Sequence, residues 1–310
     1  MQPLHLALRT SHRTGHLAPR TSHPLDPSAD PFYRRVAMAT TVRKAVILAR
    51  GLGTRMRRED LDASLSPEQA EAAGRGVKAL LPIGERPFLD YVISGLADAG
   101  FGQVCLVIGP EHDALRRRYT IDTVPRRVGI SFAVQVEPRG TADAVLSSRA
   151  FAGDELFLAI NSDNYYPVDV LRSLRLIGRP ALPGFDRRGL IEQGNIDPER
   201  IARFALLRLT PGDDLAAIVE KPDAAVRRAF GRDALVSMNC WLFGRPIFDA
   251  CAAIAPSPRG ELELADAVQR AIAMGERFRV LRVSAPVLDL TSRSDVAEVT
   301  RRLRGMDVRL

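Results

Sequence analysis

Residues 47–56 read ILARGLGTRM, an apolar run that ends in a glycine-containing loop and an arginine. Glycines such as Gly51 and Gly53 leave backbone N–H groups open to close approach by an anion. The guanidinium of Arg55 suits phosphate oxygens, because its fork of donors matches their geometry. Together these residues predict a loop that binds a phosphate chain at the end of a strand.

Two common phosphate-binding motifs do not occur in the chain. The P-loop pattern, GxxxxGK followed by Ser or Thr, is absent from the sequence. The dinucleotide-binding fingerprint needs a third glycine at the position where Met56 stands. A plain strand-to-helix turn therefore remains as an alternative for the loop taken alone.

Further polar groups follow later apolar segments. Lys78 opens the segment KALLP, residues 137–142 read EPRGTA, and residues 161–164 read NSDN. In an open parallel sheet ligands bind at the carboxyl ends of strands, so we expect these groups to converge on one crevice. A glycine loop with Arg55, Lys78 and Asp163 is the set of groups expected for a nucleoside triphosphate and its magnesium ion.

Strands and helices alternate along the chain from Arg43 onward. Near-continuous apolar strands separated by helices predict an α/β fold, a Rossmann-like and mostly parallel sheet with helices on both faces. The predicted strands are Lys44–Ala49, Gln103–Ile108, Ile130–Val136 and Glu155–Asn161. The predicted helices are Phe88–Ala99 (stopped by Gly100), a short helix near Glu111–Arg118, and Thr141–Phe151 (capped by Thr141).

After Ile177 the predicted segments become shorter and less regular. The predicted strands there are Ile201–Leu209, Leu215–Glu220, Leu235–Phe243 and Phe278–Val283. The predicted helices are Ala224–Phe230, Leu262–Met274 and Asp295–Leu303. One domain over residues 43–310 accounts for this pattern, with its second half forming the far side of a cleft.

Residues 1–42 differ from the rest of the chain. They hold four of the five histidines, several prolines and no periodic apolar pattern, which predicts a disordered N-terminal extension. A solvated tail, a targeting peptide rich in Arg and Ser, and upstream sequence translated by mistake are the three alternatives. Met38 stands just before the first ordered-looking segment, so we favour a true start at Met38.

The bulk composition narrows the classes of function. The chain has 310 residues, of which 46% are hydrophobic and 26% charged, as in an ordinary globular protein. Its three scattered cysteines argue against a disulfide framework or a zinc cluster and predict a cytoplasmic location. No apolar run approaches the ~20 residues of a membrane span. The net charge is +7, but basic residues are dispersed and aromatic residues make up 6%, so we expect no nucleic-acid partner. A homo-oligomer is compatible with the sequence.

Four motifs, in their order along the chain, resemble the sugar-1-phosphate nucleotidyltransferase family. That family has a glycine loop ending in Thr-Arg, then Lys-x-Leu-Leu-Pro, then an aspartate in a short loop, then Glu-Lys-Pro. Here the motifs are Gly51–Arg55, Lys78–Pro82, Asp163 and Glu220–Pro222, within a resemblance that covers residues 44 to about 303. The resemblance implies a single-domain nucleotidyltransferase architecture of the GT-A-like kind. It also implies a reaction between a nucleoside triphosphate and a sugar 1-phosphate, with Mg²⁺ as cofactor and an NDP-sugar and pyrophosphate as products.

The resemblance assigns five residues of the first two motifs to the triphosphate. Gly51, Gly53 and Thr54 are implied to bind the nucleotide, with the glycine N–H groups on the β and γ phosphates. Arg55 is implied to neutralise the departing pyrophosphate. Lys78 is implied to neutralise the α-phosphate as charge grows there.

Asp163 and Asp289 are the magnesium ligands that the resemblance implies. Asp289 lies in the segment PVLDLT, which resembles a late family segment in which an aspartate follows a strand. An unpaired carboxylate between apolar residues is costly, and coordination to magnesium would account for it. A structural ion pair, or a cap for the helix near Asp295, is the alternative for Asp289.

Other residues resemble those that bind the sugar and the base. Lys221 resembles the lysine that receives the sugar phosphate, and Glu220 the acid that accepts hydrogen bonds from sugar hydroxyls. Asn239, in VSMNCWLF, faces the sugar or is structural. Gln135 fits a reader of the base edge, because a side-chain amide offers both a donor and an acceptor to a pyrimidine. Gly140 would let the base lie close to the backbone.

The chain also departs from the family pattern. Arg50, Val77 and Ser162 stand where the family usually has a small residue, a proline and a glycine. The segment Arg57–Val77 is longer than usual, and its Ser66–Gln69 stretch predicts a capping box and a short helix. The bulk of Arg50 beside the phosphates favours an alternative function, a catalytically silent homologue that binds nucleotide or sugar as a regulator. The charged groups retained in the four motifs favour the enzyme.

Overall fold

The computed structural model describes residues 41–310, apart from residues 52, 59, 61, 62, 64, 76 and 232. The predictions for residues 1–40, the disordered extension and the start at Met38, lie outside the described residues. The described residues form one compact unit.

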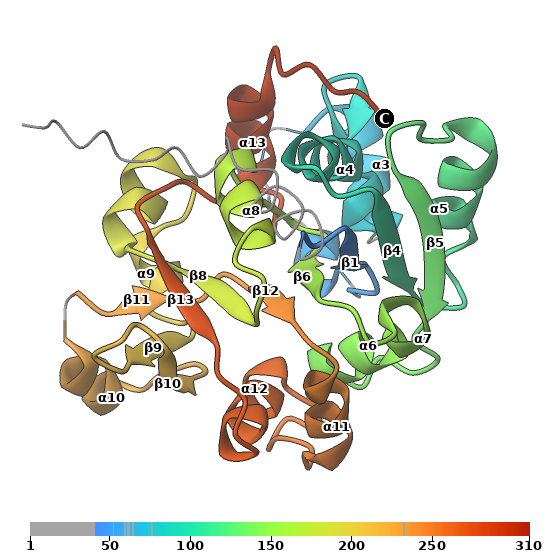
Figure 1. The fold of residues 1–310 in the computed structure, drawn as a ribbon. Coiled ribbons are helices and arrows are strands. Elements are labelled where there is room, and N and C mark those ends of the chain that lie inside the picture. Colours follow the sequence, from blue (N-terminus) through green and yellow to red (C-terminus); the bar gives the residue numbers. More distant parts are fainter. Residues whose placement is uncertain are drawn as a thin grey trace, which may run out of the picture. The chain divides into compact units, whose positions relative to one another are not determined.

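A ten-stranded sheet forms the centre of this unit. Its strands are β1 Lys44–Leu48, β4 Gln103–Ile108, β5 Gly129–Val134, β6 Phe157–Asn161, β8 Ala181–Phe185, β9 Leu206–Leu209, β10 Leu215–Val219, β11 Leu235–Val236, β12 Cys240–Phe243 and β13 Arg279–Val283. Their order is β10-β9-β11-β8-β12-β6-β1-β4-β5, with β13 paired to β8 (Figure 1). Two small sheets pair β2 Pro82–Ile83 with β3 Arg86–Pro87, and β7 Asn164–Tyr165 with β14 Leu288–Asp289.

The predicted fold class, an α/β sheet covered by helices, is confirmed. The strands β6, β1, β4 and β5 are parallel to one another, and so are β8 and β13. Strand β12 runs antiparallel to β6 and β8, and β9, β10 and β11 continue the antiparallel half. The parallel half is the part in which near-continuous apolar strands are separated by helices in the sequence.

Helices cover both faces of the sheet. They are α2 Thr54–Arg57, α3 Pro67–Arg75, α4 Phe88–Ala99, α5 Asp113–Arg117, α6 Thr141–Ser147, α7 Arg149–Ala152, α8 Val168–Arg175, α9 Pro198–Ile201, α10 Ala224–Phe230, α11 Pro246–Ala253, α12 Leu264–Ala273 and α13 Asp295–Leu303. A 3₁₀ turn lies at Lys78–Leu80, and π-helical turns lie at Arg118–Asp122 and Gly189–Gln193.

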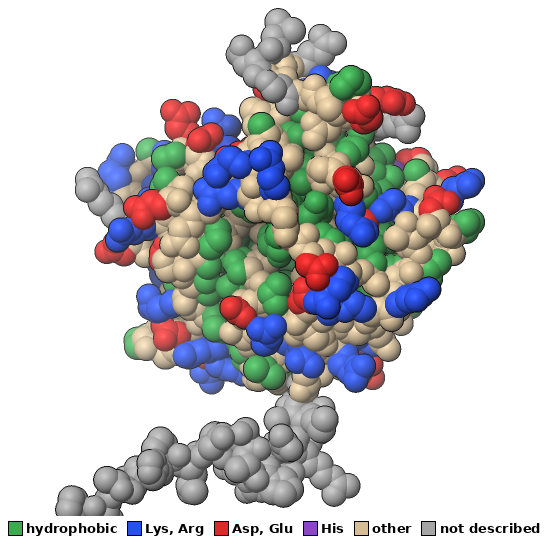
Figure 2. Space-filling model, turned by 90° about the horizontal axis from the view of Figure 1, so that it is seen from above, with side chains coloured by type: hydrophobic (Ala, Val, Ile, Leu, Met, Phe, Trp, Pro, Cys, Tyr) green, Lys and Arg blue, Asp and Glu red, His purple; other side chains and the backbone are tan. Residues whose placement is uncertain are grey.

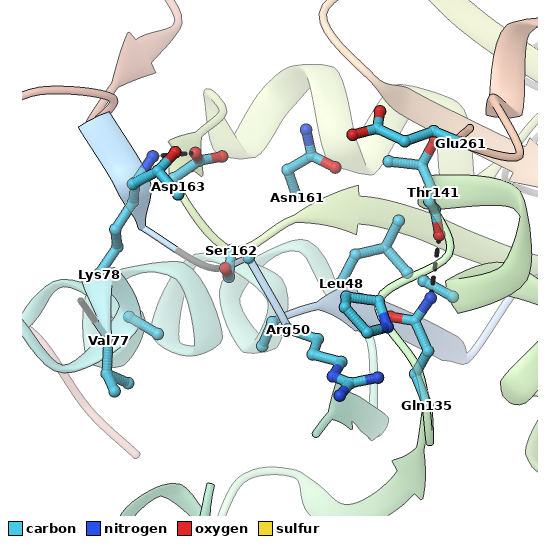
Figure 3. Close-up of a pocket in the computed structure, with 17 residues that line it drawn as sticks. Leu48, Arg50, Val77, Lys78, Gln135, Thr141, Asn161, Ser162, Asp163 and Glu261 are labelled. Atoms are coloured by element: carbon cyan, nitrogen blue, oxygen red, sulfur yellow. Dashed lines mark hydrogen bonds and ion pairs between the residues drawn. The ribbon is translucent and has the colours of Figure 1, made fainter. Parts of the chain in front are cut away.

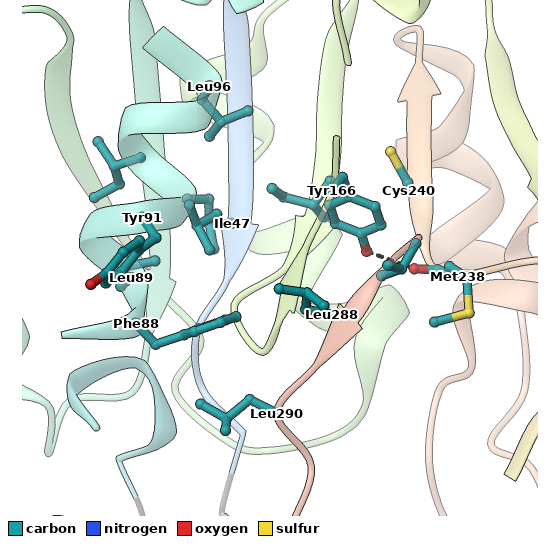
Figure 4. Close-up of a cluster of buried hydrophobic side chains, with 14 of the residues drawn as sticks. Ile47, Phe88, Leu89, Tyr91, Leu96, Tyr166, Met238, Cys240, Leu288 and Leu290 are labelled. Atoms are coloured by element: carbon teal, nitrogen blue, oxygen red, sulfur yellow. Dashed lines mark hydrogen bonds between the residues drawn. The ribbon is translucent and has the colours of Figure 1, made fainter. Parts of the chain in front are cut away.

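The alternation of side chains along each strand divides the apolar core into two layers. In β1, Ala45 and Ile47 join one buried cluster and Val46 joins the other. Helices α4, α8 and α13 pack on the first cluster, and α6, α11 and α12 pack on the second (Figure 1). Figure 4 shows the first cluster, in which Phe88 and Leu96 of α4 lie beside Ile47.

Several predicted elements match the structure residue for residue. Strand β4 and helices α4, α10 and α13 have the predicted bounds. Helix α4 ends where Gly100 takes a positive φ of 96° and its N–H reaches the carbonyls of Leu96 and Ala97. The predicted capping box is also confirmed, because the Ser66 N–H donates to Gln69 Oε1 at 3.0 Å and the Gln69 N–H to Ser66 Oγ at 3.3 Å.

Two predicted strands of the second half are wrong in part. The segment Ile201–Leu209 is not one strand, because Pro198 opens the helical turn α9, which ends at Ile201, and β9 begins only at Leu206. The segment Leu235–Phe243 is broken into β11 and β12, because Asn239 takes a positive φ of 55° that a strand cannot contain. Both segments are rich in residues that favour β-strands, so their composition gave no sign of either interruption.

The predicted helix Thr141–Phe151 is two short helices, α6 and α7, that meet at Ser148. The predicted cap by Thr141 is wrong, because the residue before the helix is Gly140 and no side chain caps it. Instead, the Thr141 Oγ1 accepts a hydrogen bond from the backbone N–H of Leu264 at 3.0 Å. The remaining predicted elements differ from the observed ones by only one or two residues at their ends.

The surface shown in Figure 2 mixes basic and acidic side chains, and several Lys and Arg groups lie next to Asp or Glu. On α13, for example, Arg301 and Arg302 both pair with Glu298. Within the described part of the chain, the helices are all too short or too polar to cross a membrane.

Candidate active site

A pocket of about 410 Å³ lies at the carboxyl ends of the parallel strands (Figure 3). Its walls come from the segments that follow β1, β5 and β6 and from the 3₁₀ turn that begins at Lys78. Six of the predicted site residues line it: Gly51, Thr54, Lys78, Gln135, Gly140 and Asp163. The expected convergence of these segments on one crevice is therefore observed. Six other predicted site residues lie outside its lining: Gly53, Arg55, Glu220, Lys221, Asn239 and Asp289.

The glycine loop forms the entry from β1 into the short helix α2. Gly53 precedes α2 with φ 60° and ψ 24°, a left-handed conformation that glycine adopts without steric cost. Gly51 is exposed at the pocket, where its backbone is open to a ligand. Arg55 is exposed on α2, away from the pocket lining. The loop thus presents backbone groups to the pocket, while the role of Arg55 stays a prediction.

An ion pair between Lys78 and Asp163 closes one side of the pocket. The Lys78 Nζ lies 3.1 Å from Asp163 Oδ2, although the two residues are 85 positions apart in the sequence. Their side chains are 13% and 25% exposed, so both charges remain accessible to a small ligand. The pair places a cation and a carboxylate together at the point where both were predicted to act.

Asp289 lies behind this pair, on β14. Its backbone pairs with Asn164 of β7, and the Leu290 N–H donates to the carbonyl of Asp163 at 2.8 Å. The Asp289 side chain is buried, and it pairs with Arg200 through Oδ2 at 2.5 Å and accepts from Thr291 Oγ1 at 2.6 Å. The ion pair foreseen as an alternative for Asp289 is therefore present, and Arg200 is a partner that the sequence did not reveal.

The surroundings of Asp289 disfavour its charge. Burial, and after it the nearby charge of Asp163, raise the pKa of Asp289 to about 6, because Arg200 and Thr291 offset only part of these two effects. Two carboxylates whose charges disfavour each other provide oxygen ligands, which suit a divalent cation such as Mg²⁺. The residues present therefore fit a magnesium ion held by Asp163 and Asp289.

The opposite wall of the pocket contains Gln135, and its hydrogen bonds require a correction. The Nε2 group of this buried side chain donates to the carbonyl of Gly140 at 3.0 Å and to Asp143 Oδ2 at 2.9 Å. Both amide hydrogens are thus used, and Arg139 holds the other oxygen of Asp143. Gln135 can offer a base its Oε1 acceptor, but the predicted second role as a donor is wrong in this arrangement.

Gly140 has a structural reason to be glycine. It takes a φ of 116°, and a Cβ atom there would lie 2.5 Å from the carbonyl oxygen of Leu262. The absent side chain therefore makes room for the neighbouring backbone of residue 262, as well as for any ligand in the pocket.

The predicted sugar side shows backbone strain at two residues. Among described residues other than glycine, positive φ values occur at Asp213, Lys221 and Asn239, with 45° for Lys221 and 55° for Asn239. Such conformations are costly and gather at functional sites. Burial raises the pKa of Glu220, which precedes Lys221. Lys221 and Asn239 are exposed and Glu220 is half-buried, so all three remain accessible.

Two charged pocket residues were not predicted as ligands. Arg50 is buried, with 9% of its surface exposed, and it lines the pocket together with Val77 and Ser162, the two other departures from the family pattern. Glu261 also lines the pocket, from the segment before α12. Sequence reasoning missed Glu261 because its segment, RGELEL, has no motif that separates it from an ordinary solvated loop.

The structure thus combines an α/β architecture with a pocket at a glycine loop. A model of the nucleotidyl transferase family matches residues 44–285, and the chain belongs to that family. It is 30% identical over 266 residues to glucose-1-phosphate thymidylyltransferase of Streptomyces griseus, covering 83% of this chain and 65% of that protein. It is 26% identical over 261 residues to UTP–glucose-1-phosphate uridylyltransferase AglF of Haloferax volcanii, covering 84% of this chain and 96% of that one.

Solved structures support the same fold. A UDP-glucose pyrophosphorylase complexed with UDP-glucose aligns with a TM-score of 0.64 at 18% identity, over 84% of this chain and 98% of that one. A putative glucose-1-phosphate thymidylyltransferase from Bacillus anthracis aligns with a TM-score of 0.65 at 19% identity, over 85% and 96%. The predicted family is confirmed. Nothing in these comparisons favours the catalytically silent alternative.

Proposed function

We propose that the protein transfers a nucleoside monophosphate from a nucleoside triphosphate to a sugar 1-phosphate. An oxygen of the sugar phosphate attacks the α-phosphorus, and the bond from the α-phosphorus to the bridging oxygen of the β-phosphate breaks. That electron pair leaves with pyrophosphate, and the product is an NDP-sugar. Relatives named for glucose 1-phosphate with a thymidylyl or uridylyl group make these the first substrates to test.

The observation that carries this proposal is the Lys78–Asp163 pair at the pocket. Such a transfer brings two anions together, so the site needs charge that is arranged before the substrates arrive. In the absence of substrate, each partner neutralises the other. When a triphosphate enters, the Lys78 ammonium can exchange the carboxylate for an oxygen of the α-phosphate, where charge grows during transfer.

Lysine usage supports a special role for Lys78 and Lys221. Of the 44 basic Lys and Arg residues in the chain, only three are lysines: Lys44, Lys78 and Lys221. Lys44 has a structural partner, since its Nζ lies 2.5 Å from Glu155. The other two stand at the predicted positions for the α-phosphate and the sugar phosphate. A lysine ammonium acts on phosphate as a compact point charge, whereas an arginine presents a planar fork of donors.

Asp163 and Asp289 would hold the magnesium ion. When bound, the ion neutralises phosphate charge during transfer. Asp163 lines the pocket and Asp289 supports it from behind, so the first is the more direct ligand. Gly51 and Gly53 would offer backbone N–H groups to the β and γ phosphates, with Thr54 beside them, and Arg55 would neutralise the departing pyrophosphate.

The sugar 1-phosphate would bind on the side of Glu220, Lys221 and Asn239. Lys221 would receive its phosphate, and Glu220 would accept hydrogen bonds from its hydroxyls. Strained backbone at Lys221 and Asn239 supports this assignment, because such strain is retained where side chains must be aimed.

The experiment that tests the proposal is pyrophosphate release over a matrix of nucleoside triphosphates and sugar 1-phosphates, with Mg²⁺. We expect release only when both substrates are present, and loss of at least about 100-fold in Asp163→Asn, because an amide cannot replace the carboxylate charge. Asp169→Asn is the matched control, since Asp169 is exposed on α8 and should leave the rate unchanged. Nucleotide binding without turnover on any sugar phosphate would contradict the proposal.

Two further predictions remain part of the proposal. A cytoplasmic location is consistent with the three cysteines, which are all buried and free. A homo-oligomer stays a prediction that a sedimentation measurement can check.

A further inference from the structure

Arg50 is a buried cation in the pocket wall. It lies between Ala49 and Gly51, directly after β1, and 9% of its surface is exposed. It lines the same pocket as Gln135 and Gly51. A fully charged side chain in such a position is costly unless its hydrogen-bonding groups have partners.

The partners of Arg50 within the described residues are incomplete. Its Nε lies 3.5 Å from Glu111 Oε1, a long contact, and the Glu111 side chain is 48% exposed to solvent. Its Nη1 is buried and has no hydrogen-bond partner there. The guanidinium therefore has one enclosed donor without a partner, in a residue that lines the pocket, and an acceptor on a ligand would satisfy it.

The sheet register places Arg50 and Gln135 at the same edge of the sheet. Strands β1, β4 and β5 are neighbours, with Leu48 paired to Val107 and Ile108 paired to Val134. Arg50 and Gln135 therefore follow the two strands that flank the end of β4. Residue 109, which follows β4, is a glycine, and the carboxylate of Glu111, the ion-pair partner of Arg50, lies against it. Figure 3 shows the guanidinium of Arg50 on the same side of the pocket as Gln135.

The donors of Gln135 are already used within the protein. Both hydrogens of its Nε2 go to Gly140 and Asp143, so only Oε1 remains for a base. Oε1 can accept from a ring N–H, but a carbonyl next to that N–H then needs a donor from another residue. Arg50, on the same pocket wall, has such a donor.

We propose that Arg50 is a specificity-determining residue that donates a hydrogen bond to a carbonyl oxygen of the nucleobase. The proposal rests on the proposed function, in which Gln135 faces the base. Uracil and thymine fit this pair of groups, because their ring N–H is flanked by a carbonyl on each side. Cytosine presents a bare ring nitrogen to Oε1 and an amino group in place of one carbonyl. Arg50 thus favours uracil and thymine nucleotides over cytosine nucleotides.

The test is a calorimetric titration with three probes, UTP, CTP and inorganic tripolyphosphate, in Mg²⁺ and without sugar phosphate. The variants are Arg50→Ala and Arg50→Met, of which the second keeps most of the packing volume without any donor. Arg117→Ala is the matched control, since Arg117 is an exposed arginine on the neighbouring helix α5. Thermal unfolding checks that each variant is folded.

We expect wild-type protein to bind UTP more tightly than CTP. Both Arg50 variants should lose about tenfold or more in affinity for UTP, as for a hydrogen bond from a charged donor. Their affinity for tripolyphosphate should stay within about twofold, and the UTP-to-CTP ratio should shrink. Arg117→Ala should match wild type.

Three results would overturn the role of Arg50. An equal loss for tripolyphosphate would make Arg50 a phosphate ligand, unchanged UTP affinity would make it structural, and tighter nucleotide binding would make it an obstruction. A wild-type protein that binds none of the three probes would contradict the proposed function itself. Failure of the inference and failure of the function are therefore distinguishable.

Discussion

The hydroxyl of Tyr166 donates a hydrogen bond to the backbone carbonyl of Met238 at 2.6 Å, and the carbonyl of Asn239 lies 3.3 Å from the same oxygen (Figure 4). Tyr166 is buried three residues after Asp163, and Asn239 has the strained φ of 55°. Tyr166, which follows the predicted metal ligand Asp163, thus fixes the backbone of the loop that contains Asn239, the predicted sugar ligand.

We predict that Tyr166→Phe raises the KM for sugar 1-phosphate several-fold and leaves the KM for nucleotide unchanged, because Asn239 loses its support. Stability should fall by about 1 kcal/mol, the usual net value of one buried hydrogen bond. Tyr165→Phe is the matched control, since the Tyr165 hydroxyl makes no hydrogen bond with the described residues. Equal effects of the two substitutions on the sugar KM would show that Tyr166 does not position Asn239.

The raised pKa of Asp289 predicts a pH dependence of magnesium binding. The metal needs the carboxylate, whereas the free site favours the protonated acid up to a pKa of about 6. The affinity for Mg²⁺ should therefore rise about tenfold per pH unit below about 6 and level off above it. Calorimetric titration of the nucleotide-free protein measures this, and an affinity independent of pH between 5 and 7 would argue against Asp289 as a ligand.

Stability without metal should change in the opposite direction. A carboxyl group whose pKa is higher in the folded state than in the unfolded chain favours folding when protonated. The contribution of Asp289 to the free energy of unfolding should therefore fall as the pH rises from about 4 through about 6. Asp289→Asn should remove this fall, and exposed Asp169→Asn should retain it. A pH dependence that survives in Asp289→Asn would assign it to another group.

Lys221 tests the separation of the two substrates. We predict that Lys221→Ala raises the KM for sugar 1-phosphate by about tenfold or more, the effect of losing one charge-assisted contact. Nucleotide affinity measured without sugar should change little. Lys221→Arg keeps the positive charge, so this variant separates the effect of losing the charge from the effect of changing the side chain. If Lys221→Ala weakened nucleotide binding alone, the two substrates would lie in the opposite halves of the site.

Gly140→Ala should destabilise the fold itself. The new Cβ would lie 2.5 Å from the carbonyl oxygen of Leu262, and the φ of 116° is unfavourable for any other residue. We expect a loss of about 3 kcal/mol in the free energy of unfolding in denaturant. Gly153→Ala is the control, because Gly153 also has a positive φ but no atom within 4 Å of its Cβ position, so about 1 kcal/mol is expected there.

The sequence predicted best what depends on local chemistry. The apolar period and Gly100 defined α4, and Ser66 with Gln69 defined the start of α3. The carboxyl-end rule for parallel strands placed Asp163, which follows β6, at the pocket, whereas Lys78 reaches Asp163 from a 3₁₀ turn.

Local sequence patterns did not predict contacts between residues that lie far apart in the chain. The partnership of Arg200 with Asp289 joins residues 89 positions apart, and no motif marks Arg200. Gln135 resembled a residue with a free amide, but Asp143 and the Gly140 carbonyl use both of its hydrogens. The break in the predicted strand at Asn239 depends on a positive φ, which the β-rich composition of the segment does not predict.

The most direct test of the central claim follows the phosphorus atoms with radiolabelled nucleotide. With UTP labelled at the α-phosphate or at the γ-phosphate, glucose 1-phosphate and Mg²⁺, the products are separated by chromatography. Transfer at the α-phosphorus, supported by Lys78 and Asp163, predicts that the α-label appears in an NDP-sugar and the γ-label in pyrophosphate. The γ-label in the sugar, or released as inorganic phosphate with the α-label left in UDP, would contradict nucleotidyl transfer by this site.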